Sequence, residues 1–260
     1  MSMKVGKGSA LFSALTEPEE TGGQEIIPYI KKFLTIHPYT GGFTVEDSQY
    51  VSKEQNIEKK HFHPSGDCLK CPRLLYWERD PNHVSDLSEP VSPELQVIFK
   101  TGNALHAMIQ AWLQAMGELP GFPKCIGNEY RLDDEEWNIG GFIDSVIQFP
   151  GNDYPTCIEI KTINDYRFNT LHAPLPAHKL QVGCYLMELD SPHGIVLYIN
   201  KNTGALKEFA VEPVDMMPTL RKWSSVRVAV QEHDINMLDH GCRKGDKVWE
   251  KCPARAFCHR

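Results

Sequence analysis

The chain has 260 residues, 41% of them hydrophobic and 10% aromatic, which is enough to bury a sizeable core and excludes a wholly disordered protein. A formal charge of -7 argues against a uniformly basic nucleic-acid-binding surface, although a local basic groove is compatible with an acidic total. We find no apolar run near the roughly 20 residues of a membrane span, and the first residues lack the apolar region of a signal peptide. We therefore expect a cytoplasmic protein that has no membrane partner.

Residues 1–60 are rich in turn formers and carry one short apolar stretch, at 26–34. We interpret them as an N-terminal arm or appendage. The pattern changes at Ser65, a suitable helix N-cap, and an amphipathic helix is predicted from there to Trp77. The main domain is predicted to span 61–260.

Beyond residue 90 the pattern alternates between helices and strands. Ser92 and Pro93 begin a long helix, in which apolar residues recur at steps of three and four until Gly117. The later patterns predict strands at 125–132, 137–149, 156–163, 194–200 and 205–211, and helices at 176–189 and 215–238. This order is typical of an α/β fold with a mixed central sheet flanked by helices.

The most informative stretch couples two adjacent strands. Glu159 and Lys161 are two residues apart, so both side chains leave the same face of their strand, and a short turn can bring Asp144 beside them. Two carboxylates suit a hard divalent cation, with the backbone carbonyl of Ile160 as a further oxygen ligand. Lys161 would then orient an attacking water or offset charge on a phosphate. An exposed strand with a Glu159–Lys161 salt bridge explains the triplet equally well.

Polar residues on two predicted helices add to this set. His106 follows Gly102 by one turn on the same face, where the missing glycine side chain would let the helix approach the sheet. Gln181 and Tyr185 share one face of their helix and could both reach a substrate backbone. A single histidine on a core helix is more often structural than a ligand, so the combination matters more than any member.

Four short motifs therefore stand in order along the chain: Gly102-x-x-x-His106, Gly141-Phe142-Ile143-Asp144, Glu159-Ile160-Lys161 and Gln181-x-x-x-Tyr185. In this order and at these intervals they resemble the RecB-like branch of the PD-(D/E)xK nucleases, over about residues 65–258. The resemblance implies a restriction-endonuclease-like core. It implies that Lys161 is the catalytic lysine and that Gln181 and Tyr185 hold DNA near the scissile phosphate. The implied ligands of Mg²⁺ or Mn²⁺ are His106, Asp144, Glu159 and the carbonyl of Ile160.

One further acidic residue, Glu129, matches an acidic position of the family less well, and a surface salt bridge explains it equally.

The eight cysteines divide into two groups, and in a cytosolic chain they would stay reduced. Cys125, Cys157 and Cys184 fall within strand or helix patterns and are expected to be buried thiols. The other five lie near the two ends of the main domain: Cys68, Cys71, Cys242, Cys252 and Cys258.

The terminal cysteines resemble the iron-sulfur staple of a sub-branch that includes CRISPR-associated RecB-like exonucleases, the AddB nuclease domain and phage homologues. The resemblance implies a 4Fe-4S cluster that ties the two ends of the domain together. Its candidate ligands are Cys71, Cys242, Cys252 and Cys258.

Two features depart from that pattern. Cys68 competes with Cys71 for the N-terminal position, and Trp249 occupies the place where the first C-terminal cysteine usually lies. Zinc is the alternative to the cluster, and the local ligand types that suit it are His61, His63, Cys68 and Cys71.

Positive charge gathers near both ends of the domain. Residues 241–260 contain six Lys or Arg and two Asp or Glu, so this segment carries +4 and the remaining chain -11. A second basic group comprises Lys59, Lys60, Lys70, Arg73 and Arg79. If a cluster joins these segments, their charges could neutralise phosphates. Interleaved aromatic residues could stack on unpaired bases, although core packing is the commoner role: Tyr76, Trp77, Trp249 and Phe257.

We therefore expect a metal-dependent DNA nuclease that acts as an exonuclease on single-stranded or frayed ends, in phage or bacterial recombination, repair or CRISPR adaptation. Its partners would be DNA and, in some settings, recombination or CRISPR adaptation proteins. A DNA-binding adaptor that keeps the fold but cleaves weakly or not at all is the alternative from another class. A zinc-stapled nuclease is the third possibility.

Overall fold

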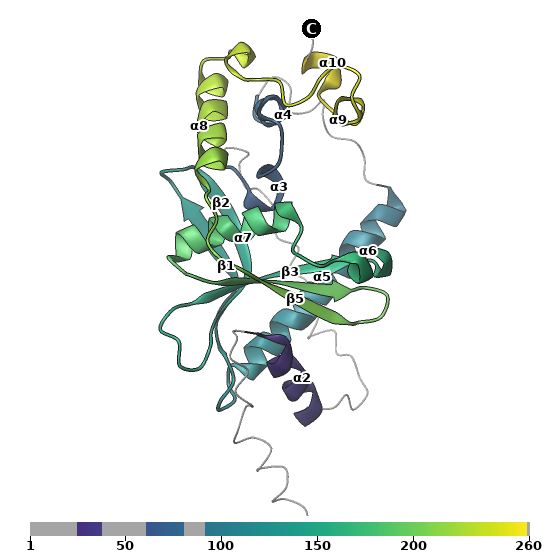
Figure 1. Cartoon of the computed structure of the whole chain (residues 1–260), viewed down its shortest axis with the longest axis vertical. Helices are drawn as coiled ribbons and strands as arrows, with labels where there is room; N and C mark the ends of the chain where they lie inside the picture. The colour runs from purple at the N-terminus through teal and green to yellow at the C-terminus, as the bar shows by residue number, and fades with distance from the viewer. Residues whose placement is uncertain (1–24, 38–60, 81–91, 259–260) are drawn as a thin grey trace, which may run out of the picture.

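The computed structural model describes residues 25–37, 61–80 and 92–258, arranged around one five-stranded sheet (Figure 1). The strands lie in chain order across the sheet, and only β3 and β4 run parallel. Their bounds are β1 (Lys124–Asp134), β2 (Ile139–Gln148), β3 (Thr156–Ile163), β4 (Gly194–Asn200) and β5 (Leu206–Val211). The predicted α/β class with a mixed sheet is confirmed.

Helices cover both faces of this sheet (Figure 1). The helices are α2 (Ile27–Ile36), α3 (Pro64–Asp67), α4 (Pro72–Trp77), α5 (Pro93–Met116), α6 (Asp165–Thr170), α7 (Pro176–Leu189), α8 (Met217–Gln231), the 3-10 helix η3 (Ile235–Met237), α9 (Lys247–Glu250) and α10 (Arg255–Cys258). On one face α2 and α5 pack against apolar side chains of β3 and β4. On the other, α3, α4, α7 and α8 form the second apolar cluster.

Parallel neighbours such as β3 and β4 need a crossover connection, and α6 with α7 supplies it. The predicted helix 176–189 coincides with α7. The short helix α6 was not predicted from the sequence. Its N-terminus is capped by Asn164, whose side chain accepts a hydrogen bond from the Arg167 backbone N–H.

Two predicted helices are shorter in the structure. The helix expected at 65–77 is divided into α3 and α4, because Pro72 disfavours a helical conformation at the preceding residue and Cys71 is extended (φ -60°, ψ 139°). The helix expected at 215–238 ends at Gln231, since His233 has a left-handed φ of 53° and the chain turns there into η3.

The long helix α5 has the predicted bounds, and the Ser92 hydroxyl accepts from the Leu95 N–H. Its first turns are not core, however: Leu95 and Ile98 are 40% and 48% exposed. Burial begins further along, with Ile109 and Leu113 inside the cluster shared with α2. The prediction of a core helix is therefore correct only for its C-terminal part.

The described part of residues 1–60 packs on the sheet. Ile26, Ile30 and Phe33 are buried beside α5, and the carboxylate of Glu208 on β5 accepts from the backbone N–H groups of Ile26 and Ile27. A carboxylate at a helix N-terminus is favourable because it satisfies N–H groups that lack helical partners. The predicted boundary near residue 60 stays a prediction.

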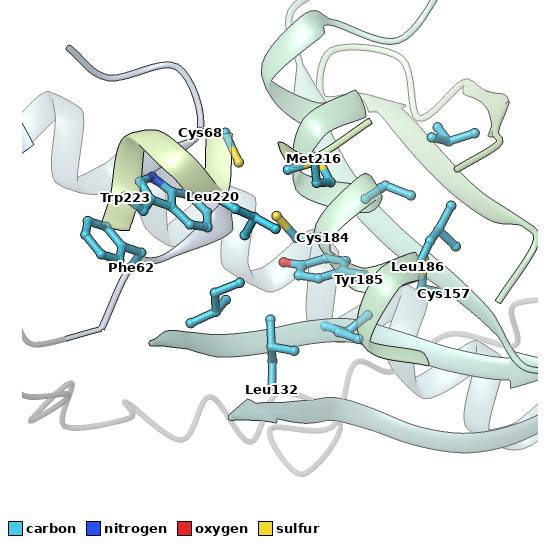
Figure 2. Packing of buried hydrophobic residues seen from close by; sticks show 14 of the residues in the cluster. Phe62, Cys68, Leu132, Cys157, Cys184, Tyr185, Leu186, Met216, Leu220 and Trp223 are labelled. Atoms are coloured by element: carbon cyan, nitrogen blue, oxygen red, sulfur yellow. The ribbon is translucent and has the colours of Figure 1, made fainter. Parts of the chain in front are cut away.

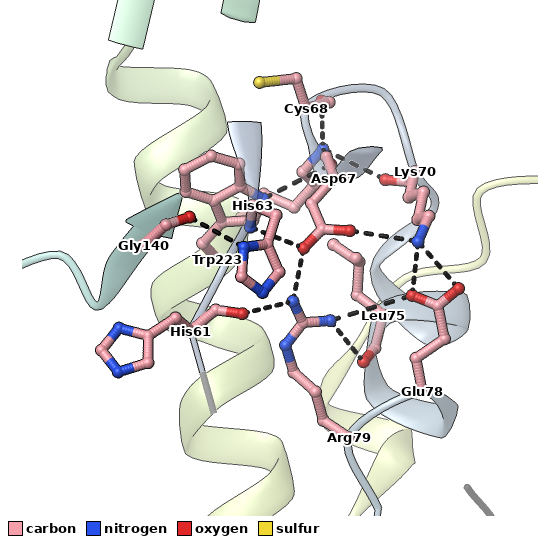
Figure 3. Close-up of polar contacts among 11 residues, drawn as sticks. His61, His63, Asp67, Cys68, Lys70, Leu75, Glu78, Arg79, Gly140 and Trp223 are labelled. Carbon is pink, nitrogen blue, oxygen red and sulfur yellow. Dashed lines mark hydrogen bonds and ion pairs between the residues drawn. The ribbon is translucent and has the colours of Figure 1, made fainter. Parts of the chain in front are cut away.

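The segment that precedes α4 is held against β2 and α8. Phe62 stacks on Trp223, with ring centroids 5.1 Å apart, and it forms an isolated bridge to Ile139 (Figure 2). The guanidinium of Arg79 lies over the Phe62 ring, 4.2 Å from its centroid. It also pairs with Asp67 (Figure 3). The resulting stack joins three segments that are distant in sequence. None of the helices in the described ranges is both long and apolar enough to cross a membrane.

Candidate active site and cysteine cavity

The candidate site lies where β2 and β3 separate. These strands pair only between 145–147 and 156–158, and Asp144 is the first residue beyond the paired segment. One carboxylate oxygen of Asp144 accepts from the backbone N–H of Ile160 at 2.7 Å. The other lies 3.5 Å from Nδ1 of His106. The side chain of Asp144 thus occupies the fork that the two strands leave open.

Helix α5 brings His106 to this fork. A Cβ on Gly102 would lie 3.2 Å from the hydroxyl of Thr162 on β3, so the helix backbone passes close to the strand at this point. The predicted reason for this glycine is confirmed. His106, one turn later, is only partly buried, and its Nδ1 faces the Asp144 oxygen that does not accept from Ile160.

Glu159 and Lys161 leave the same face of β3, as predicted, and form an ion pair of 2.6 Å. Glu159 is 2% exposed, and the amide of Gln181 donates to the same oxygen, Oε1, at 2.8 Å. In the described structure its other oxygen, Oε2, is buried and has no hydrogen-bond partner. Burial and the charge of Asp144 raise the pKa of Glu159, and Lys161 and Gln181 offset this only in part.

Gln181 and Tyr185 do meet on one face of α7, where the Gln181 amide lies 2.7 Å from the Tyr185 hydroxyl. Both side chains are buried, and the Tyr185 hydroxyl donates to the carbonyl of Phe142 on β2. In this structure Gln181 holds Glu159, and Tyr185 contacts Gln181 and the Phe142 carbonyl. The prediction that they reach a DNA backbone stays a prediction.

Two polar residues near the site were not predicted from the sequence. Gln110, one turn after His106, donates to the Asp144 carbonyl at 2.7 Å and to the Glu129 carboxylate at 3.0 Å. Glu129 is exposed and has a left-handed φ of 51°, and Gln110 links it to the site. His178 lies one turn before Gln181 on α7. Helical spacings of three and four from the motif residues are the signal that could have found both.

Across residues 25–37, 61–80 and 92–258, no three His, Cys, Asp or Glu side chains form a group arranged to hold a metal ion. The structure does bring His106, Asp144, Glu159 and Lys161 to one end of the β2–β3 pair. The metal ligands named from the sequence stay a prediction.

The four predicted cluster cysteines line one cavity of about 250 Å³ between the N- and C-terminal parts of the domain. They are Cys71, Cys242, Cys252 and Cys258. Burial and the neighbouring thiols raise the pKa of Cys242. At Gly241 an added Cβ would lie 2.7 Å from the Cys71 sulfur, so the loop after η3 packs directly on that cysteine.

Cys68 does not line this cavity. It is buried, and its sulfur points toward that of Cys184 on α7 (Figure 2). Cys157 and Cys184 are fully buried, as predicted, whereas Cys125 is only partly buried. The geometry therefore separates Cys68 from Cys71.

The local zinc set does not converge on one point either. Nδ1 of His63 is 2.8 Å from the Gly140 carbonyl (Figure 3). Cys71 lines the cysteine cavity, whereas Cys68 does not.

The described members of the second basic group are engaged within the fold. Arg73 is buried and donates to the carbonyls of Leu238 and Cys258, which ties α4 to the C-terminal segment. Lys70 pairs with Glu78 and Asp67, and Arg79 pairs with Asp67 (Figure 3). The predicted phosphate-binding role is therefore wrong for Arg73 and Arg79. Two members lie outside the described residues: Lys59 and Lys60.

The predicted stacking residues also contact one another. Trp77 packs against Phe257 with centroids 5.6 Å apart, and Tyr76 is buried against Trp77. These contacts join the two ends of the domain. Basic residues of the C-terminal segment are exposed: Arg243, Lys244, Lys247, Lys251 and Arg255.

In comparison with known proteins, neither a family model nor a curated protein matches the chain. Similar solved structures include the crystal structure of SSO0001, with 18% identity over 89% of this chain and 94% of that one, at a TM-score of 0.46. They also include an alkaline exonuclease (LHK-Exo) from Laribacter hongkongensis, with 12% identity over 67% of this chain and 89% of that one, at a TM-score of 0.46. LHK-Exo in complex with dAMP matches at 14% identity, the same coverage and the same TM-score. Such values establish no function for this chain.

Proposed function

We propose that the protein is a metal-dependent nuclease that hydrolyses phosphodiester bonds of DNA. The observation that carries the proposal is the fork between β2 and β3, where His106, Asp144, Glu159 and Lys161 come together from three elements. An ion pair that served only the stability of a strand would not require a second carboxylate and an imidazole beside it.

The chemistry of the donor atoms near this fork supports a divalent cation, although among the described residues their side chains are not yet arranged as a metal site. Oε2 of Glu159 is buried without a partner in the described structure, and the charge of Asp144 lies close enough to raise the pKa of Glu159. Such an arrangement is unfavourable unless a cation balances it. The proposed ligands of Mg²⁺ or Mn²⁺ are His106, Asp144, Glu159 and the Ile160 carbonyl. When bound, the cation would polarise the phosphodiester and lower the pKa of an attacking water.

The chain's own side chains would then do three things. The ion pair with Glu159 holds the ammonium of Lys161 at the fork, where it can offset charge on a phosphate. Gln181 and Tyr185 keep Glu159 in one orientation. His106 and the Ile160 N–H hold both oxygens of Asp144.

The proposed substrate is a single-stranded or frayed DNA end, and the proposed setting is recombination, repair or CRISPR adaptation. Exposed basic residues at 243–255 support a polyanionic partner because they have a net positive charge and face the solvent.

The test is the release of nucleotides from end-labelled DNA in Mg²⁺ or Mn²⁺. Asp144→Asn and Lys161→Ala should each abolish it, while the exposed controls Asp153→Asn and Lys124→Ala should cleave normally. Circular single-stranded DNA should resist cleavage if an end is required. Cleavage by the two site variants at the normal rate would contradict the proposal. DNA binding without cleavage of any substrate would favour the adaptor function.

We also propose that Cys71, Cys242, Cys252 and Cys258 hold a 4Fe-4S cluster. Four cysteines that line one cavity at the two ends of the domain support such a group. Anaerobically purified protein should be brown and contain four irons per chain. Cys252→Ser should lose this iron, and Cys125→Ser should keep it. Stoichiometric zinc in a colourless protein would select the zinc alternative.

A further inference from the structure

His178 is a polar residue of α7 for which the roles above have no use. It precedes Gln181 by three residues and Tyr185 by seven, so all three lie on the helix face that packs on the sheet. Unlike the other two, it is only partly buried. It therefore lies at the edge of the site, where the buried face of α7 meets solvent.

A chain of hydrogen bonds determines which nitrogen of His178 carries the proton. The Leu175 N–H donates to the Tyr198 hydroxyl at 3.0 Å, and that hydroxyl lies 2.8 Å from Nδ1 of His178. Tyr198 is fully buried, so its hydroxyl proton needs an acceptor within the protein. In these contacts that acceptor is Nδ1 of His178. The network thus assigns Nδ1 as an acceptor and leaves the ring proton on Nε2.

The ring is also kept neutral. Burial and the positive charge of Lys161 lower the pKa of His178 to about 4. Burial likewise raises the pKa of Tyr198, so its phenol keeps the proton that it donates. In this state His178 presents Nε2–H as a donor and adds no charge to the site.

Lys161 is the charged neighbour of this ring, and its positive charge contributes to the lowered pKa of His178. Lys161 and Tyr198 are directly paired residues of the parallel strands β3 and β4, so their side chains leave adjacent positions on one face of the sheet. An ammonium and an Nε2–H group are both donors and cannot bond to each other. An anionic oxygen placed between them would accept from both.

We propose that His178 is a further phosphate-binding residue, which donates from Nε2 to a non-bridging oxygen of the DNA phosphate beside Lys161, and that Tyr198 is the residue that positions it. The identity of the anion rests on the proposed nuclease function. The nearness of His178 to Tyr198 and of Tyr198 to Lys161 rests on the hydrogen bonds and the strand register, and the direction of Nε2 toward the phosphate is part of the proposal.

Kinetics with end-labelled DNA test the donor. His178→Ala removes Nε2–H and should lower kcat about tenfold, in keeping with the loss of one hydrogen bond to a charged group. His178→Gln places an amide N–H near the position of Nε2 and should restore most of this rate. Tyr198→Phe should fall between the two. His172→Ala, which changes an exposed histidine between α6 and α7, is the matched control and should behave as wild type.

Two measurements do not depend on cleavage. Nitrogen NMR of ¹⁵N-histidine-labelled protein should show His178 with its proton on Nε2, and Tyr198→Phe should mix the two tautomers. Fluorescence anisotropy with a single-stranded oligonucleotide in EDTA should show severalfold weaker binding for His178→Ala than for His172→Ala. If no DNA is cleaved but these two results hold, the nuclease function fails and the phosphate donor stands. A proton on Nδ1, or equal binding and cleavage by His178→Ala and wild type, would overturn the inference.

Discussion

Asp144 accepts a hydrogen bond from the backbone N–H of Ile160, 2.7 Å away, at the point where β2 and β3 stop pairing. A side chain thus takes the place of a strand partner for this N–H. The same contact orients the second carboxylate oxygen toward His106. One residue therefore serves the stability of the sheet edge and the geometry of the candidate site, and substitutions can separate the two roles.

Asp144→Ala should destabilise the protein by about 1–3 kcal/mol, because the N–H of Ile160 loses its acceptor in a partly buried position. Asp144→Asn keeps an oxygen acceptor and should lie within about 1 kcal/mol of wild type, although it removes the negative charge. Urea unfolding monitored by circular dichroism measures both. Equal unfolding midpoints for the alanine variant and wild type would show that Ile160 does not depend on this contact.

Gln181→Leu should lower kcat about tenfold and leave KM for DNA unchanged. The reason is that Gln181 is buried and donates to Glu159, so its loss disturbs the carboxylate and no DNA contact. Steady-state kinetics separate the two parameters, with the exposed Met187→Ala on the same helix as control. A raised KM at constant kcat would support the DNA-binding role that the motif implied.

Asp67→Asn should cost about 3 kcal/mol at neutral pH, because Arg79 and Lys70 would lose their buried counter-charge. Burial acts to raise the pKa of Asp67, but Arg79, the His63 N–H and Lys70 outweigh it, so the folded-state pKa lies below the ordinary 3.8. The stabilisation is therefore complete above pH 3.8 and is lost as the pH falls through the lower folded-state pKa.

The comparison of Asp67→Asn with wild type gives this pH dependence directly. The difference in urea midpoint should be the same at pH 7 and pH 5 and should shrink below pH 3.8. If the difference in urea midpoint grew as the pH fell, the pKa of Asp67 in the folded protein would not be lowered.

Arg73→Met should destabilise the protein by about 2–3 kcal/mol even after chelation of metals, because the carbonyls of Leu238 and Cys258 would lose buried charged donors. Thermal unfolding with and without chelator measures this, and the exposed Arg243→Met is the control. If chelation removed the whole difference in unfolding temperature between Arg73→Met and wild type, the link between α4 and the C-terminal segment would depend on the bound group and not on the guanidinium.

Local patterns predicted much of the fold and part of the site. The helices α5 and α7 begin at Pro93 and Pro176, which mark their first positions. Strand β3 follows from alternating apolar and polar residues, and β4 follows from an uninterrupted apolar run. The shared face of Glu159 and Lys161 follows from the two-residue period of a strand. The split of the helix at 65–77 was missed although Pro72 marked it.

Local sequence patterns did not predict the contacts between elements that are distant in sequence. Periodicity shows which face of a helix a residue shares, but it does not show whether that face is covered. Leu95 and Ile98 carry the same spacing as Ile109 and are exposed, whereas Gln181 is polar and buried. Burial depends on which element packs opposite, and that partner is distant in sequence.

The sequence by itself determined the order of the five strands, the helices α5 and α7, the motif residues and the two cysteine groups, because each depends on neighbours within one helix or strand. Only the tertiary structure decided that Cys71 faces the shared cavity while Cys68 faces Cys184, and that Gln181 holds Glu159. The same holds for His178 on α7, whose Nδ1 lies 2.8 Å from the hydroxyl of Tyr198 on β4. These relations depend on the directions of side chains from elements that meet only when the sheet and its helices have packed.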